Sequence, residues 1–210
     1  AHDTSNASTW RVADINSGAV SSDPGYFMEI LVGDTLYFDA VVGSSGRELW
    51  AHNTSNSSTW RVADILSGIS GSNPGQNMGI FVGDTLYFGA NDGSSGHELW
   101  AHDTSNASTW RVADINSGSS NSRPGYSMEE ILVGDTLYFS ADDGSSGREL
   151  WAHDTSNAST WRVADINSGT GSSNPGEWIE SGLVGDTLYF DADDGSSGYE
   201  LWAHDTSNAS

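Results

Sequence analysis

One eighteen-residue string, WAHDTSNASTWRVADINS, returns down the chain about every fifty residues with small variations. A repeat of this length cannot bury its apolar surface alone, so neighbouring copies must stack on one another. We therefore expect a single domain over residues 1–210. It consists of four tandem repeats, 1–50, 51–100, 101–151 and 152–202, and an eight-residue overlap, 203–210.

Composition narrows the classes of partner. The formal net charge is -22, from 29 acidic residues against seven arginines and no lysine. Such a surface repels nucleic acid and anionic membranes, so we exclude both as partners. No apolar run approaches the roughly 18 residues of a membrane span, which predicts no membrane insertion. Cysteine is absent, and the aromatic residues recur at fixed places in each repeat, as core residues do.

Each repeat predicts four short strands. In the stretch 23–65, turn signals separate runs of apolar, β-branched and aromatic residues, and no segment has helical spacing. The predicted strands are Ile30–Val32, Thr35–Ala40, Glu48–Thr54 and Thr59–Ile65. The fold class is therefore all-β.

Four antiparallel strands in a repeat of about fifty residues are typical of one β-propeller blade. We predict a β-propeller of four four-stranded blades. The N-terminal strand, Thr9–Ile15, would close the last blade by pairing with the three strands within Leu183–Thr206. The alternative is that each chain is half of an eight-bladed ring of two chains, which makes self-association a possible property.

The repeated residues resemble a known bacterial motif. ELW, a following Asp, TSNAS and TWRVADI, with the Pro-Gly loop and the LYF strand, resemble the ELWxxDGT repeat of hyalin-like proteins. This chain has Thr and Ser where that motif has glycines, at Thr4, Thr54, Thr104, Thr155, Ser8, Ser58, Ser108 and Ser159. The resemblance implies a propeller-like fold in a secreted or cell-surface bacterial protein, and it implies no reaction.

The four copies differ mainly in two loops. One loop precedes the first strand of each blade, and the other joins its second and third strands; both emerge at one end of the blade. The VGDT and TSNAS turns at the opposite end hardly change. Because rigid scaffolds place recognition on loops, the variable end predicts binding of an asymmetric partner, with neutral drift as the alternative. Trp178 is an aromatic residue at this end without a counterpart in the other copies.

Tryptophan also recurs beside the uniform TSNAS turn, where it could stack on sugar rings. The candidate ligand-binding residues are Trp10, Trp60, Trp110, Trp161 and the non-repeated Trp178. Four equivalent sites would make the protein a multivalent lectin. The second repeated set, which includes Trp151 and Trp202, is expected in the core between blades.

Acidic turns suggest a possible cofactor. Clusters of carboxylate oxygens are the ligands that calcium prefers, although Asp-Gly turns also form without a metal. No other cofactor is predicted. The candidate calcium ligands are Asp142, Asp143, Asp191, Asp193 and Asp194.

Nothing in the sequence predicts an enzyme. There is no cysteine, lysine, phosphate-binding glycine loop or GxSxG motif, and no singular pair of carboxylates. The repeated Arg–Asp pairs, such as Arg61 with Asp64, and the glutamate of ELW predict structural ion pairs. We expect a non-catalytic extracellular structural or binding module, possibly a segment of a longer repeat array. The alternatives are the multivalent lectin, with a glycan or surface partner, and an engineered symmetric propeller scaffold.

Overall fold

The computed structural model describes residues 1–208. The chain forms two compact units, Ala1–Pro74 and Gly75–Ser210, and each is described by itself. The last two residues of the predicted overlap, 209–210, lie outside the described residues. No described helix is long and apolar enough to cross a membrane.

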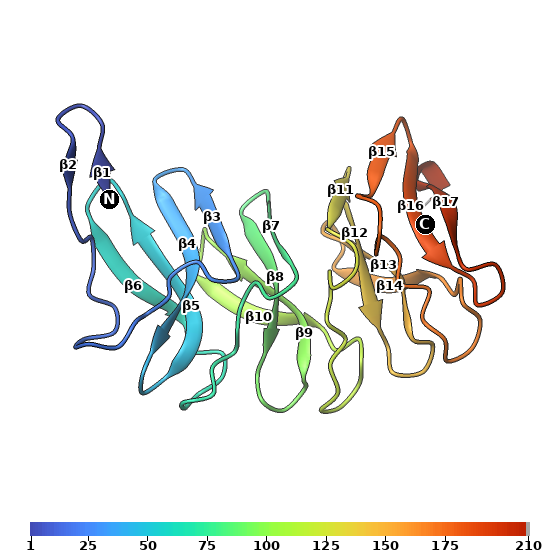
Figure 1. Ribbon diagram of the computed structural model, residues 1–210, viewed down its shortest axis with the longest axis horizontal. Coiled ribbons are helices and arrows are strands. Elements are labelled where there is room, and N and C mark those ends of the chain that lie inside the picture. Colours follow the sequence, from blue (N-terminus) through green and yellow to red (C-terminus); the bar gives the residue numbers. More distant parts are fainter. Residues whose placement is uncertain (209–210) are drawn as a thin grey trace. The chain divides into compact units, whose positions relative to one another are not determined.

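The first unit contains a short hairpin and one antiparallel sheet (Figure 1). The hairpin is β1 (His2–Asp3) with β2 (Ser8–Thr9). The sheet, called sheet 1, has the order β3 (Glu29–Val32), β4 (Thr35–Val42), β5 (Gly46–Asn53) and β6 (Ser58–Ala63).

The second unit contains three further sheets (Figure 1). Sheet 2 is β7 (Gly79–Val82), β8 (Thr85–Asn91), β9 (His97–Asp103) and β10 (Ser108–Ala113). Sheet 3 is β11 (Ile131–Val133), β12 (Thr136–Asp142), β13 (Arg148–Asp154) and β14 (Ser159–Ala164). Sheet 4 is β15 (Gly182–Val184), β16 (Thr187–Asp193) and β17 (Tyr199–Asp205), followed by the 3-10 turn η1 (Thr206–Asn208). These strands confirm the predicted all-β repeat.

Neighbouring sheets in the second unit bury their faces against each other. Side chains alternate between the two faces of a strand, so every second residue of β12 points the same way. Leu137 and Phe139 pack in one cluster with Tyr87 and Leu99 of sheet 2. Tyr138, on the opposite face, belongs to a second cluster that includes residues of sheet 4. Each sheet is therefore apolar on both sides, as expected for stacked repeats.

The N-terminal strand differs from the prediction. Among the described residues, β2 pairs with β1 in the register His2↔Thr9 and Asp3↔Ser8. Sheet 4 has three strands, so Thr9–Ile15 is not its fourth strand as predicted. The physical reason is sequence separation: a four-residue turn, residues 4–7, joins the hairpin strands. Closing so short a loop costs far less chain entropy than closing a loop of most of the chain.

The glutamate of ELW ties down the variable loop that follows each complete sheet. Glu98 is fully buried and accepts hydrogen bonds from the Ser122 backbone N–H at 2.9 Å, the Ser122 hydroxyl at 2.7 Å and the Ile115 N–H at 2.8 Å. Glu48 and Glu149 make the same bonds in their own repeats. Burial raises the pKa of Glu98 from 4.5 to about 7, against the opposing effect of these hydrogen bonds.

The same loop passes so close to the turn between the second and third strands that only glycine fits there. Gly96 has a φ of +72°, and a Cβ at this position would collide with the backbone of Ser120. Gly147 stands in the same relation to Gly171. Gly118 also has a positive φ, +97°, but has nothing within 4 Å of an added Cβ.

We predict that Gly96→Ala lowers the free energy of unfolding by about 3 kcal/mol, because the left-handed backbone is strained and the methyl group collides with the loop. The control Gly118→Ala has the backbone strain without the collision, so we expect a cost of about 1 kcal/mol. Urea unfolding of both variants measures the difference. Equal costs would contradict the close approach.

Stability should also depend on the protonation of Glu98. Because its folded-state pKa is raised, the stabilisation from its protonated form is complete below pH 4.5 and is lost as the pH rises to 7. Glu98→Gln removes this titration. The difference in unfolding free energy, wild type minus variant, should therefore fall between pH 4.5 and pH 7.5 in urea titrations. A difference that stays constant or rises would contradict a buried carboxyl with a raised pKa.

Candidate functional site

At the variable end of each sheet, two neighbouring positions, one on the second strand and one on the third, change together from repeat to repeat. In sheet 1 the Arg47 guanidinium pairs with the buried Asp39 carboxylate. In sheet 2 the corresponding residues are Gly89 and His97, and the His97 ring occupies the space that a side chain at Gly89 would fill. Burial lowers the pKa of His97 to about 4, so the ring is neutral at neutral pH. The variation between repeats at these two positions is therefore coupled.

In sheet 4 the paired positions are Asp191 and Tyr199. The Asp191 carboxylate accepts hydrogen bonds from the backbone N–H groups of Trp178, at 3.2 Å, and Ile179, at 3.0 Å. The Tyr199 ring meets the Trp178 indole edge-on, with centroids 6.0 Å apart. These contacts fix the backbone of the loop that carries Trp178, while the indole itself is 72% exposed.

A groove of about 300 Å³ opens beside this tryptophan. It is lined by Ser127 and Glu129 of the loop before β11 and by the segment 176–181 of the loop before β15. These two loops belong to the repeats that each contain one extra residue. Three glutamates, Glu129, Glu177 and Glu180, line it with Trp178, so the groove combines an aromatic face with hydrogen-bond acceptors.

Four of the predicted calcium ligands lie at two turns, and the fifth, Asp191, lies within β16; all of them use their oxygens in hydrogen bonds within the protein. Asp143 accepts hydrogen bonds from Ser145 and Ser146 and lies 3.4 Å from Arg162. Asp142 and Asp193 each cap the N–H of a following glycine. Hydrogen bonds from the backbone N–H groups of Ser197 and Ser196 lower the pKa of Asp194 to about 2. Among residues 1–208 no three acidic or histidine side chains are placed so that they could hold a metal ion together, and the calcium site stays a prediction.

The repeated tryptophans beside TSNAS are divided between surface and core. Trp10 follows β2, whereas Trp60 and Trp110 lie on the fourth strands β6 and β10, and all three are about half exposed. Trp161 on β14 is partly buried and packs against the core between sheets 3 and 4. Three of these four indoles are therefore open to solvent, and the fourth contributes to the core. The second repeated set of tryptophans was expected in the core between blades. Trp151 and Trp202 of this set do pack against the apolar clusters between neighbouring sheets.

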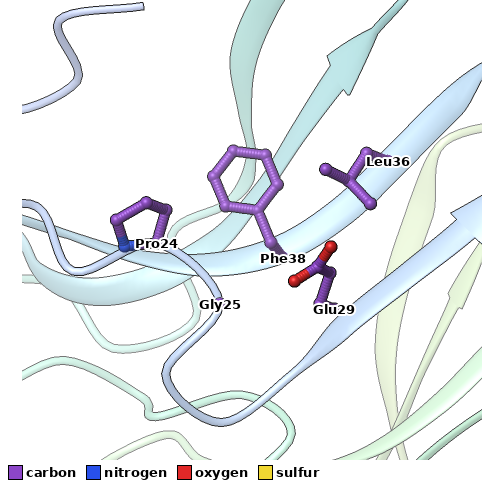
Figure 2. A pocket seen from close by; sticks show the side chains of 5 residues that line it. All are labelled: Pro24, Gly25, Glu29, Leu36 and Phe38. Atoms are coloured by element: carbon purple, nitrogen blue, oxygen red, sulfur yellow. The ribbon is translucent and has the colours of Figure 1, made fainter. Parts of the chain in front are cut away.

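The first unit has a small apolar pocket of its own. Figure 2 shows Leu36 and Phe38 of β4 and Glu29 of β3, with Pro24 and Gly25 of the preceding loop. Its volume is about 170 Å³. The adjoining cavity of about 260 Å³ is lined by the segment that follows β2 and by Leu36 and Phe38 again.

Sequence reasoning assigned the charged residues only in part. Each repeated Arg pairs with the Asp three residues later, and two of them hold a second carboxylate: Arg162 lies 3.4 Å from Asp143 and 3.8 Å from Asp165, and Arg111 is paired in the same way. The glutamate of ELW, however, has serine and backbone partners and not an arginine, as Glu149 shows with Ser173. The signal that was missed is a serine repeated 24 residues after each of these glutamates.

No family model and no curated protein matches this chain. Solved structures do match. A puromycin hydrolase structure has a TM-score of 0.52 and 13% identity, over 83% of this chain and 26% of that one. The computationally designed Ika8 protein gives 0.46 and 12% identity, over 84% and 45%. BamB from Moraxella catarrhalis gives 0.42 and 17% identity, over 84% and 47%.

The chain thus spans between about a quarter and a half of the length of these proteins. At such identities the likeness concerns the fold alone. Taken with the repeated antiparallel sheets that stack face to face, the match to the puromycin hydrolase structure places the fold in the β-propeller class.

Proposed function

We propose that this chain is a non-catalytic β-propeller module that binds a carbohydrate at the variable end of its sheets. The observation that carries the proposal is the groove beside Trp178. The two repeats with an extra residue border it together, so the departure from regular repetition coincides with a hollow. An unrepeated groove suits one asymmetric ligand per chain.

The chemistry of the groove favours a sugar. The exposed Trp178 indole offers a flat apolar surface for the C–H face of a sugar ring. The glutamates around it accept hydrogen bonds from hydroxyl groups, and ligand sites typically combine an apolar surface with a few such polar groups. The acidic surface, with no lysine, disfavours anionic partners.

The setting we propose is extracellular. The resemblance to the ELWxxDGT repeat supports a secreted or surface-displayed bacterial protein, in which this chain is a structural and binding segment. An engineered propeller scaffold would have the same fold, and it would have no reason to place Trp178 and three glutamates around one groove.

A multivalent lectin is the second candidate. The half-exposed indoles of Trp10, Trp60 and Trp110 favour it, since they recur beside nearly identical turns. The two candidates differ in stoichiometry: the groove predicts one sugar per chain, whereas the repeated tryptophans predict several equivalent sites.

We predict that Trp178→Ala weakens binding at least tenfold, because the sugar loses its stacking surface. An array of immobilised glycans identifies a binder, and calorimetric titration of that glycan measures affinity and the number of sites. The matched control is Trp110→Ala, which removes an exposed indole at the opposite end of a sheet.

One site per chain, lost in Trp178→Ala and kept in Trp110→Ala, is the expected result. Several sites per chain that are reduced by Trp110→Ala and unaffected by Trp178→Ala would establish the multivalent lectin instead. An array on which no glycan binds would contradict both carbohydrate proposals.

A further inference from the structure

Within the described part of the second unit, the face of sheet 4 that points away from sheet 3 is apolar and has no covering layer. Leu201 is 68% exposed there, whereas the corresponding Leu150 of sheet 3 is 1% exposed. Tyr189 and Ala203 are exposed as well, and their counterparts Tyr138 and Ala152 are completely buried. In sheet 3, the same three residue types form the core that receives the next sheet.

Sheet 4 also lacks the strand and the loop that complete the other sheets. Glu200 is exposed, although its three counterparts are buried and hydrogen-bonded to a serine and a backbone N–H. In sheet 3 the missing strand corresponds to β14, whose sequence STWRVA pairs with β13 in the register Leu150↔Ala164 and Ala152↔Trp161.

The first unit contains this missing strand. Residues 8–13 have the same sequence, STWRVA, as β14, and only their first two residues are in a strand, β2. Ser22, which corresponds to the glutamate-bound Ser72, Ser122 and Ser173, is only partly buried, whereas those three are fully buried. The sequence of one end of the chain thus supplies the groups that the other end lacks.

The cavity of about 260 Å³ in the first unit lies where the second unit has side chains of a preceding sheet. Val12, Ala13 and Ile15 line it from one side, and Leu36 and Phe38 of sheet 1 from the other. In the second unit the corresponding Val112, Ala113 and Ile115 pack with the corresponding Leu137 and Phe139, and Tyr87 and Leu99 complete that cluster. The cavity therefore lies where a tyrosine and a leucine of a preceding sheet would pack.

We propose that sheet 4 of one copy of this chain docks into the first unit of a second copy. Leu201 would pair with Ala13, and Ala203 with Trp10, in the register of the complete sheets. Glu200 would accept hydrogen bonds from Ile15 and Ser22. The AHD of β17 would replace β1, and because residues 203–205 repeat residues 1–3, the pairing groups are unchanged.

The occupant is a second copy because neighbouring sheets pack across their full width. The cluster between sheets 2 and 3 draws on all four strands of sheet 2, from Ile80 on β7 to Val112 on β10. Strands lie about 4.8 Å apart, so the fourth is about 14 Å from the first. The angle between neighbouring sheets is largest in the smallest rings, so their outer strands separate most when a ring has only four sheets. Packing across the full width therefore favours a ring of more than four sheets, to which a second copy of this chain would contribute.

Cross-linking tests the docking directly, since the chain has no cysteine of its own. One preparation carries Ala13→Cys, and a second, labelled with ¹⁵N, carries Leu201→Cys. The two are mixed and oxidised, and mass spectrometry scores disulfide-linked heterodimers. In the matched control, the labelled preparation carries Leu31→Cys in place of Leu201→Cys; Leu31 is a leucine that is 64% exposed. Circular dichroism confirms that each variant is folded, and light scattering gives the mass of the unmodified protein.

We expect heterodimers to form at least tenfold faster with Leu201→Cys than with Leu31→Cys, and a solution mass of at least twice the 22.2 kDa of one chain. Equal rates for the two variants would overturn the proposal. So would a mass of one chain at every concentration, together with a disulfide that closes within a single chain in the Ala13→Cys, Leu201→Cys double variant.

Discussion

Packing of one sheet face on the next is the interaction on which the rest of this structure depends. A single sheet of three or four short strands is apolar on both sides and has no second layer of its own. In the second unit, Leu137 and Phe139 fill the space against sheet 2, while Tyr138 and Leu150 fill it against sheet 4. Burying one such side chain is worth about 2 kcal/mol, so each interface outweighs many surface ion pairs.

The buried glutamates connect this core to the candidate site. Each one holds the start of the loop that leads to the next sheet, as Glu149 does through Ser173 and Ile166. Farther along that loop, Asp191 fixes the backbone at Trp178. The loop is anchored at two points and varies in sequence between them. A rigid frame with changeable loops is the arrangement that recognition commonly uses.

The sequence was sufficient to predict the strands and their stacking, because alternation of apolar residues and glycine turns are local signals repeated four times. Three features were out of its reach. The partner of each glutamate lies 24 residues away, across a loop whose path is set by the close approach at Gly96 and Gly147. The groove at Trp178 needs two loops from different repeats to meet. The pairing of β2 with β1 was decided by chain entropy between two identical AHD segments, which a pattern of residues does not distinguish.

The claim that each sheet depends on its neighbour is tested most directly by hydrogen–deuterium exchange on Leu150→Ala. Leu150 belongs to sheet 3, and its side chain packs in one cluster with Leu188 and Phe190 of sheet 4. The account predicts that backbone amides of β16 lose protection along with those of β13, since removing the side chain leaves a cavity that both sheets line. Faster exchange confined to sheet 3, with β16 as protected as in the wild type, would contradict it.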